Sequence, residues 1–361
     1  MMEKSLVIRV DANAQAGTGH FMRCLALAQA WKIQGGQAMF ITACESDGLR
    51  QRLSDEGFRI TGIGRSYPGT ADWDLTSRFL AKDSVAWVVL DGYQFDAAYQ
   101  RRVKEMGHLL LVIDDTAHLD HYYADMILNQ NLHAKELRYS CEPHSRLLLG
   151  TRYVLMRPEF RAWRRWRREI PDVGRKVLVT LGGSDIENQT LRVIHVLECV
   201  DVKGLEVVVV VGASNPHYPE LKAIIQNSQF AVRMVRDVKD MAELMAWADL
   251  AVSAGGSTCW ELAFMGLPTV VMILAENQES IAKSLEKVGA AVNVGWYDNL
   301  STDSLFKMVT RLLKGSDVRL HMSCCGRSFV DGLGTDRVVE FMQSDLPGNI
   351  RDPRHAHSFL G

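Results

Sequence analysis

Short runs of β-branched and aliphatic residues alternate along the chain with longer segments whose apolar residues recur at helical spacing. This alternation is typical of βαβ units around a buried parallel sheet. It predicts an α/β fold in which the strands form two series. The first series comprises Leu6–Val10, Ala38–Thr42, Val85–Asp91, Leu109–Asp114 and Leu147–Leu149, and the second comprises Lys176–Leu181, Glu206–Val211, Ala231–Val235, Leu250–Ser253 and Thr269–Ile273.

The first helix has the clearest pattern. Between His20 and Ile33 the apolar residues, Met22 and Leu25 among them, form a stripe along one side, and the pair Gly35-Gly36 predicts where the helix ends. The segment therefore suits a crossover helix that packs on the sheet.

The length of 361 residues exceeds what one hydrophobic core usually organises, so two domains are expected. We assign residues 1–155 to an N-terminal Rossmann-like domain, 156–172 to a basic linker and 173–345 to a C-terminal Rossmann-like domain. Residues 346–361 lack periodicity and are expected to form a disordered tail.

The segment at 157–169 contains six arginines. It suits either an RNA-binding or phosphate-binding helix, or a solvated linker helix whose Trp163 and Trp166 dock on a domain. A single basic helix in a neutral protein is usually a solvated face, which favours the second interpretation.

Composition excludes several function classes. With 41 basic and 43 acidic residues, no overall field would attract nucleic acid or an anionic membrane. No apolar stretch reaches the length of a membrane span, so we expect a protein that is neither exported nor membrane-inserted. The seven cysteines show no CxxC pair or Cys/His cluster, which argues against zinc and fits a reducing cytoplasm.

A glycine-containing loop at 11–23 joins the first strand to the first helix. The spacing Gly17-x-Gly19-His20 allows a tight turn and lets free amides of the helix point at a ligand. The loop lacks the third glycine of the GxGxxG dinucleotide fingerprint, so a nicotinamide cofactor is not expected. A helix N-terminus disfavours the protonated imidazolium, so the His20 ring is expected to be neutral and able to accept a proton. His20 could therefore be a general base, and an equally good alternative is that it caps the helix or binds a phosphate.

A second loop, at 253–268, repeats the strand, glycine and helix design. Gly255 and Gly256 allow close approach, and Ser257 and Thr258 begin the helix, which predicts a diphosphate site. Glu261 lies one helical turn further on, where it could accept hydrogen bonds from ribose hydroxyls or be an ordinary surface residue.

Polar residues also follow other predicted strands. A loop that contains Gly183 and the polar residues Ser184 and Asn188 could line the cleft or be a plain β-to-α turn. The side-chain amides of Asn277 and Gln278 could orient a sugar or water, and Tyr93 could donate a hydrogen bond from an aromatic ring. Asp91, Asp114 and Asp115 lie past strands as well. The adjacent pair Asp114-Asp115 suggests Mg²⁺, but turn or helix-cap roles are commoner, and no metal is predicted.

Seven segments together resemble the UDP-sugar hydrolases of pseudaminic acid biosynthesis: RVDANAQAGTGHFMRCLALA, VVLDGYQF, VIDDTAH, LNQN, AGGSTCWELAFMGLP, ENQ and VDGLGTDRV. The resemblance implies a GT-B-like fold, similar to that of the glycosyltransferases that transfer N-acetylglucosamine in peptidoglycan synthesis, with two Rossmann-like domains facing a central cleft. It implies hydrolysis of UDP-2,4-diacetamido-2,4,6-trideoxy-β-L-altropyranose to UDP and free sugar.

By the same resemblance, His20 is the general base, Tyr93 and Asn277 position sugar and water, Glu261 binds the ribose, and Ser257 belongs to the diphosphate cradle. We expect a UDP-linked sugar as the partner, no cofactor and a monomer. The complete predicted substrate-binding set is Asp11, Gly17, Gly19, Arg23, Gly183, Ser184, Gly255, Gly256, Ser257, Thr258, Glu261 and Gln278.

Three alternatives use the same features. A glycosyltransferase would replace water with an acceptor hydroxyl, and a related hydrolase of spore coat polysaccharide synthesis would carry the same motifs. A non-catalytic nucleotide-sugar sensor would need no base, and His20 with Tyr93 and Asn277 argues against it.

Overall fold

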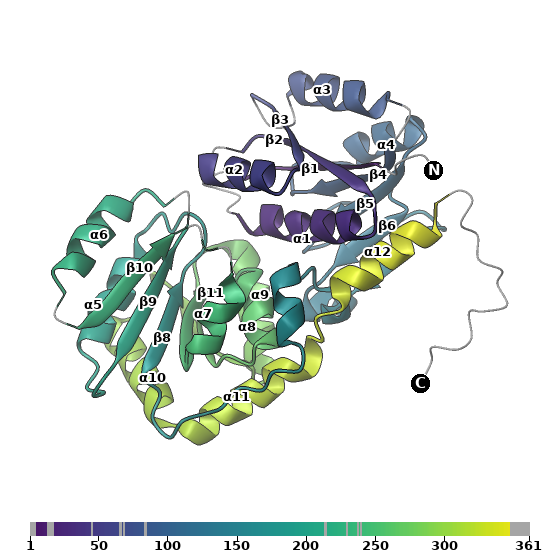
Figure 1. Cartoon of the computed structure of the whole chain (residues 1–361). Helices are drawn as coiled ribbons and strands as arrows, with labels where there is room; N and C mark the ends of the chain where they lie inside the picture. The colour runs from purple at the N-terminus through teal and green to yellow at the C-terminus, as the bar shows by residue number, and fades with distance from the viewer. Residues whose placement is uncertain are drawn as a thin grey trace.

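The computed structural model contains two parallel β-sheets, each flanked by helices on both faces (Figure 1). It describes residues 5–12, 18–44, 46–64, 67, 69–82, 85–212, 215–228, 230–236, 238 and 240–346. The predicted tail therefore falls almost wholly outside the described residues. Among those residues, no helix is both long enough and apolar enough to cross a membrane.

The first sheet has seven parallel strands in the order β3-β2-β1-β4-β5-β6-β7. The order reverses between β1 and β4, and in sheets of this kind ligands bind at the strand ends beside such a switch point. The elements are β1 (Ser5–Val10), α1 (Gly19–Ile33), β2 (Gln37–Thr42), α2 (Asp47–Asp55), β3 (Arg59–Gly62), α3 (Thr70–Leu80), β4 (Val85–Asp91), α4 (Ala97–Glu105), β5 (Leu109–Ile113), β6 (Met126–Asn129) and β7 (Arg146–Leu149).

The second sheet has six parallel strands in the order β10-β9-β8-β11-β12-β13, with its switch point between β8 and β11. Its four inner strands are largely buried on both faces, which explains their nearly continuous apolar runs. The elements are β8 (Lys176–Thr180), α5 (Gln189–Glu198), β9 (Glu206–Val211), α6 (Tyr218–Gln226), β10 (Ala231–Arg236), α7 (Met241–Trp247), β11 (Leu250–Ala254), α8 (Thr258–Phe264), β12 (Thr269–Ile273), α9 (Glu276–Lys287), β13 (Ala291–Trp296), α10 (Thr302–Lys314) and α11 (Ser316–Phe329).

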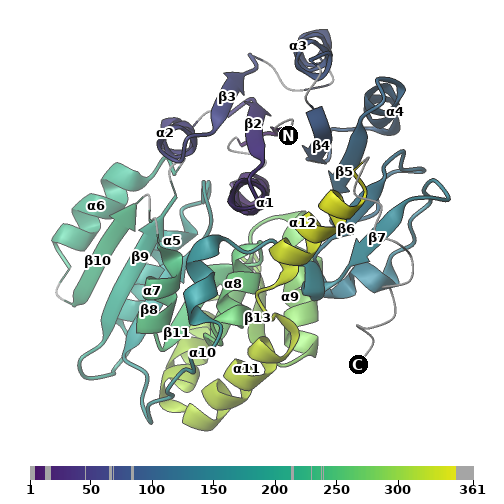
Figure 2. The same ribbon diagram turned by 45° about the vertical axis from the view of Figure 1, so that its right-hand side comes forward.

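The last helix, α12 (Gly334–Ser344), leaves the second domain and packs on the first (Figures 1 and 2). Val338 and Met342 belong to the same apolar core as α1, and the indole nitrogen of Trp87 donates to the Met342 carbonyl oxygen at 2.8 Å. The predicted assignment of 173–345 to one domain therefore differs from the structure, because amphipathic spacing does not reveal which core a helix covers.

The basic segment between the domains is not the solvated helix that we expected. It contains a short 3₁₀ helix at Pro158–Trp163. Two other 3₁₀ helices of the described residues lie before this segment, at Leu132–Glu136 and Thr151–Tyr153. The half-buried Arg168 donates to the backbone carbonyl oxygens of Met245, Ala248 and Met265. Trp163 and Trp166 do pack on the second domain's core, as predicted.

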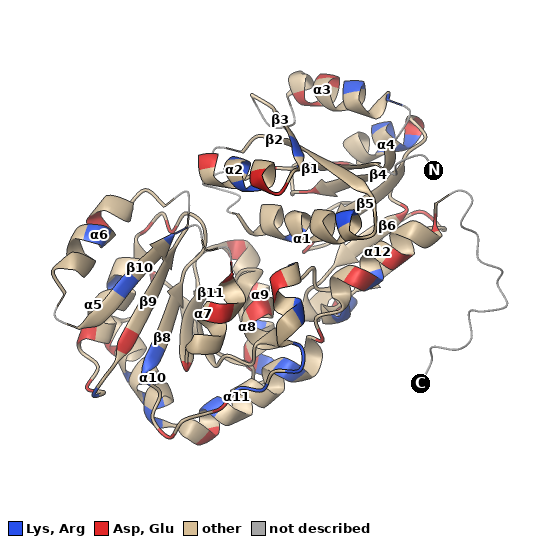
Figure 3. Cartoon of the chain, viewed as in Figure 1, with Lys and Arg blue, Asp and Glu red and all other residues tan. Residues whose placement is uncertain are grey.

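Lys and Arg residues alternate with Asp and Glu residues along the ribbon of both domains (Figure 3). This distribution matches the small net charge of the sequence. An anionic ligand must consequently be held by local groups.

Candidate functional site

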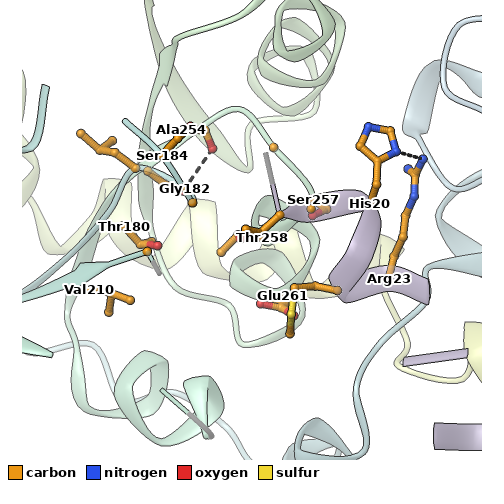
Figure 4. A pocket seen from close by; sticks show the side chains of 18 of the residues that line it. His20, Arg23, Thr180, Gly182, Ser184, Val210, Ala254, Ser257, Thr258 and Glu261 are labelled. Atoms are coloured by element: carbon orange, nitrogen blue, oxygen red, sulfur yellow. Dashed lines mark hydrogen bonds between the residues drawn. The ribbon is translucent and has the colours of Figure 1, made fainter. Parts of the chain in front are cut away.

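A cavity of ≈ 840 Å³ lies between the two domains and is lined by residues of both. On one side are the start of α1, Tyr93 and Asp115, and on the other are the loops that follow β8, β11 and β12. Figure 4 shows His20 and Arg23 on α1 opposite Ser257, Thr258 and Glu261 of the second domain. The cavity thus joins the strand ends at both switch points.

His20 forms a buried pair with Asp91, the last residue of β4. Its Nδ1 lies 2.6 Å from Asp91 Oδ1, and only 8% of His20 is exposed. Burial alone would raise the pKa of Asp91, but the charge of Arg23 and the hydrogen bonds from Arg23 and His20 lower it below the usual range. An ionised carboxylate only accepts, so we assign the proton to Nδ1, which leaves Nε2 as an acceptor.

Arg23 fixes this pair from one turn further along α1. Its Nε and Nη2 each donate to Asp91 at 2.7 Å, and its Nη1 and Nη2 donate to Asp115 at 2.8 and 2.9 Å. The predicted substrate ligand Arg23 lines the cavity but is 6% exposed and saturated by two carboxylates. It is therefore a positioning residue for His20.

The pair Asp114-Asp115 does not form a cation site. Asp114 accepts from the backbone amides of Thr116 and Ala117 and from the Tyr122 and Tyr139 hydroxyls, as a turn-capping residue does. The described residues contain no group of three or more His, Cys, Asp or Glu side chains that could hold a metal ion.

Tyr93 connects His20 to the second domain. Its ring packs edge-on against His20 with centroids 5.3 Å apart, and its hydroxyl donates to Asp115 Oδ2 at 3.2 Å. Burial and then the charge of Asp115 raise the pKa of Tyr93, so the phenol keeps its proton. The side chain of Asn277, at the start of α9, lies near the Tyr93 hydroxyl and acts to lower its pKa. The structure thus brings the three predicted catalytic residues together.

Glycines allow the loops of the two domains to touch. A Cβ on Gly19 would lie 2.9 Å from the Ser257 Oγ, and one on Gly183 would lie 2.6 Å from the Thr18 Cγ2. Ser184, Thr258 and the open Gly256 line the same part of the cavity. Small residues at these positions let backbone amides approach a bound group closely.

Gln278 holds the loop around Gly255 in place. Its Oε1 accepts from the backbone amides of Gly255 at 3.2 Å and Leu274 at 3.0 Å, and a Cβ on Gly255 would lie 2.9 Å from the Gln278 carbonyl oxygen. Gln278 lines the cavity, but its amide oxygen is used by the backbone.

Glu261 is paired with an arginine that the sequence did not single out. Buried Arg157 donates to Glu261 Oε1 from Nε at 3.1 Å and Nη2 at 2.9 Å, and it lies 2.7 Å from Glu159. The arginine compensates the negative charge of Glu261 beside a predicted anion site. Its place in an arginine-rich run was the available signal, but we had attributed that run to a solvated face.

Three other predicted positions lie elsewhere. Asp11 is buried against Arg9, accepts from Gln94 Nε2 at 2.9 Å, and is not among the residues lining the cavity. Asn188 points its amide at Glu220 on α6 and does not line the cavity either. Gly17 lies outside the described residues.

The chain is similar to known proteins in sequence and in fold. Residues 177–332 match the glycosyltransferase family 28 C-terminal domain. The chain is 25% identical over 338 residues, 93% of this chain and 97% of the relative, to the spore coat polysaccharide biosynthesis protein SpsG of Bacillus subtilis.

A second relative is the pseudaminic acid cytidylyltransferase and UDP-2,4-diacetamido-2,4,6-trideoxy-β-L-altropyranose hydrolase of Helicobacter pylori. It is 26% identical over 211 residues, which are 56% of this chain and 37% of that protein. Among solved structures, MurG of Acinetobacter baumannii superposes with a TM-score of 0.64 at 17% identity, covering 94% of this chain and 99% of that one. These likenesses confirm the predicted GT-B-like fold with two Rossmann-like domains.

Proposed function

From this GT-B-like fold and the glycosyltransferase-like second half, we propose that the protein is a UDP-sugar hydrolase in which His20 activates water. The observation that carries the proposal is the buried His20–Asp91 pair on the wall of a cavity whose opposite wall holds the glycine loops. A histidine with one nitrogen held by a carboxylate presents the other as a proton acceptor.

The leaving group would lie against the second domain. The backbone around Gly255–Thr258 and the start of α8 suit a diphosphate, and Glu261, held by Arg157, suits the ribose hydroxyls. Hydrogen-bond donors aimed at a departing diphosphate stabilise the charge that develops there.

In the reaction, the water oxygen bonds to the anomeric carbon while the bond from that carbon to the β-phosphate oxygen breaks. The electron pair leaves with UDP, and the water proton passes to His20 Nε2. Tyr93 and Asn277 join the domains beside His20 and would orient the sugar and the water. Attack opposite the departing diphosphate inverts the anomeric centre.

The substrate that we propose is UDP-2,4-diacetamido-2,4,6-trideoxy-β-L-altropyranose, in pseudaminic acid biosynthesis. Support comes from the Helicobacter relative, whose name includes hydrolysis of this compound, and from the GxGHxxR segment around His20, by which this sequence resembles the UDP-sugar hydrolases. The Bacillus relative, named for spore coat polysaccharide biosynthesis, supports a related sugar in a different polymer.

A glycosyltransferase is the second candidate. The match of residues 177–332 to a glycosyltransferase domain favours it, as does the MurG-like fold. His20 would then deprotonate an acceptor hydroxyl in place of water, and the UDP site would be the same.

The deciding experiment is an NMR time course of the full chain with the diacetamido substrate in ¹⁸O-labelled water, with a chelator and without an acceptor. Release of UDP with the label on the free sugar would support hydrolysis at the anomeric carbon. Tight UDP binding with an intact substrate would favour the transferase, and failure to bind UDP would refute both.

A further inference from the structure

Asn131 is a polar residue of the cavity wall that the reaction above does not use. It follows β6 in the segment LNQN, lines the cavity and is 1% exposed. A chain of hydrogen bonds links it to the reacting group: Asn131 donates to Asp115, Arg23 donates to both Asp115 and Asp91, and Asp91 pairs with His20. Asn131 therefore belongs to the hydrogen-bonded network that holds the proposed base.

The orientation of the Asn131 amide is determined by Asp115. Burial would raise the pKa of Asp115, but the charge of Arg23 and its hydrogen bonds hold it well below the usual range, so this carboxylate only accepts. The group 2.8 Å from Asp115 Oδ1 must then be the Nδ2 of Asn131. The Oδ1 of Asn131 is consequently the other atom, and it accepts no hydrogen bond from the described part of the chain.

The neighbouring amides differ from Asn131 in this respect. The side-chain oxygen of Gln130 accepts from the backbone N–H of Leu155 at 3.0 Å. The side-chain oxygen of Asn129 accepts from the backbone N–H of Asn131 at 3.0 Å, and its Nδ2 donates to the Tyr139 hydroxyl at 2.8 Å. These bonds hold the segment in one conformation. The Oδ1 of Asn131 is thus an unpartnered acceptor on a rigidly held residue that lines the cavity, as a recognition group requires.

We propose that Asn131 determines specificity by accepting, through Oδ1, a hydrogen bond from the N–H of an acetamido group on the sugar carbon next to the reacting one. The assignment rests on the proposed UDP-sugar site. The Asn131 Oδ1 can only accept, and nothing in the described part of the chain donates to it. An amide N–H can donate to it, whereas an ester oxygen at the same place has no hydrogen to donate.

The test compares two substrates that differ by one group: the diacetamido UDP-sugar, and its analogue with an O-acetyl ester in place of the 2-acetamido group. The ester keeps the shape and removes the N–H. Leaving a buried acceptor unpaired should reduce kcat/KM for the ester about tenfold or more in the wild type. Equal kcat/KM values for the two compounds in the wild type would overturn the proposal without any variant.

Asn131→Leu should lose the discrimination, so that the ratio of the two kcat/KM values approaches one, while UDP affinity stays at the wild-type value. If Asn131 acts only by supporting Asp115, both substrates slow equally and the ratio is unchanged, which would refute the recognition role. Asn131→Ala repeats the measurement if the leucine variant does not fold. The matched control is Asn227→Leu, which removes an exposed amide at the end of α6.

Failure of this inference and failure of the proposed function have different signatures. A wild-type protein that binds no UDP in calorimetry refutes the nucleotide site itself. A protein that binds UDP and cleaves both compounds equally retains the function and refutes only the role of Asn131.

Discussion

Replacing His20 with asparagine separates proton transfer from binding. An asparagine amide can occupy the place of the Cγ–Nδ1 edge of the ring and donate to Asp91, so the buried carboxylate keeps a partner. The change removes the Nε2 acceptor and leaves the ion pairs of Arg23 with Asp91 and Asp115 intact. The fold and the second-domain loops should therefore be preserved.

The magnitude follows from the role assigned to Nε2. A positioned general base contributes about 10²–10⁴-fold to the rate, so kcat for UDP release should fall by that factor. UDP affinity should change less than about twofold, because the proposed diphosphate and ribose contacts come from the second domain. The loss should appear in kcat without a rise in KM.

The assay pairs a coupled measurement of UDP release with calorimetric titration of UDP, using wild type and His20→Asn at equal thermal stability. His195→Asn is the control, because His195 is an exposed residue of α5 that does not line the cavity. A kcat within threefold of wild type would refute the general-base role. Parallel loss of turnover and UDP affinity would instead make His20 a phosphate ligand.

Three further predictions concern other parts of the site and the fold. Glu261→Gln should weaken UDP binding about tenfold in calorimetry, since it loses a charged acceptor for ribose and a partner of Arg157; an unchanged Kd would remove Glu261 from the nucleotide site. Gly212→Ala should lower Tm by several degrees in calorimetric scans, because its Cβ would lie 2.2 Å from the Gly183 carbonyl oxygen, and an unaltered Tm would show that the loops can separate freely. The hydrogen bond to Asp114 raises the pKa of His118, so its contribution to stability is complete below the unfolded value of about 6.5 and is lost as pH rises through the folded value. His118→Gln should therefore cost more unfolding free energy at pH 5.5 than at pH 8.5, by less than about 1 kcal/mol for this partly exposed pair, and a pH-independent cost in urea titrations would contradict the assignment.

Local patterns in the sequence predicted most strands of both sheets. Val85–Asp91, Glu206–Val211 and Thr269–Ile273 have the predicted bounds, because strands buried on both faces form uninterrupted apolar runs. The strands β3 and β6, four residues each, were not predicted, whereas the equally short β7 was predicted as Leu147–Leu149, because so short a run gives only a weak signal. The strand β13 was also not predicted, because Asn293 and Gly295 interrupt its apolar residues and both residue types are typical of turns.

Pairings between distant residues could not be predicted in the same way. The sequence placed His20 and Asp91 at strand ends, but their contact spans 71 positions and depends on β1 pairing with β4. Arg157 was assigned to solvent because a run of arginines is usually hydrated, whereas tertiary packing buries this one against Glu261. Charge compensation inside a fold is set by three-dimensional neighbours, which a linear pattern does not contain.

The return of α12 to the first domain has a consequence for how the chain is synthesised. The surface of α1 that α12 covers, together with the indole of Trp87, belongs to a segment that leaves the ribosome long before its covering helix. The first domain therefore keeps an apolar surface exposed until α12 has been synthesised, and it completes its core only then. A nascent chain stopped before residue 334 would carry that exposed surface permanently, so premature termination should yield a product that aggregates or is degraded.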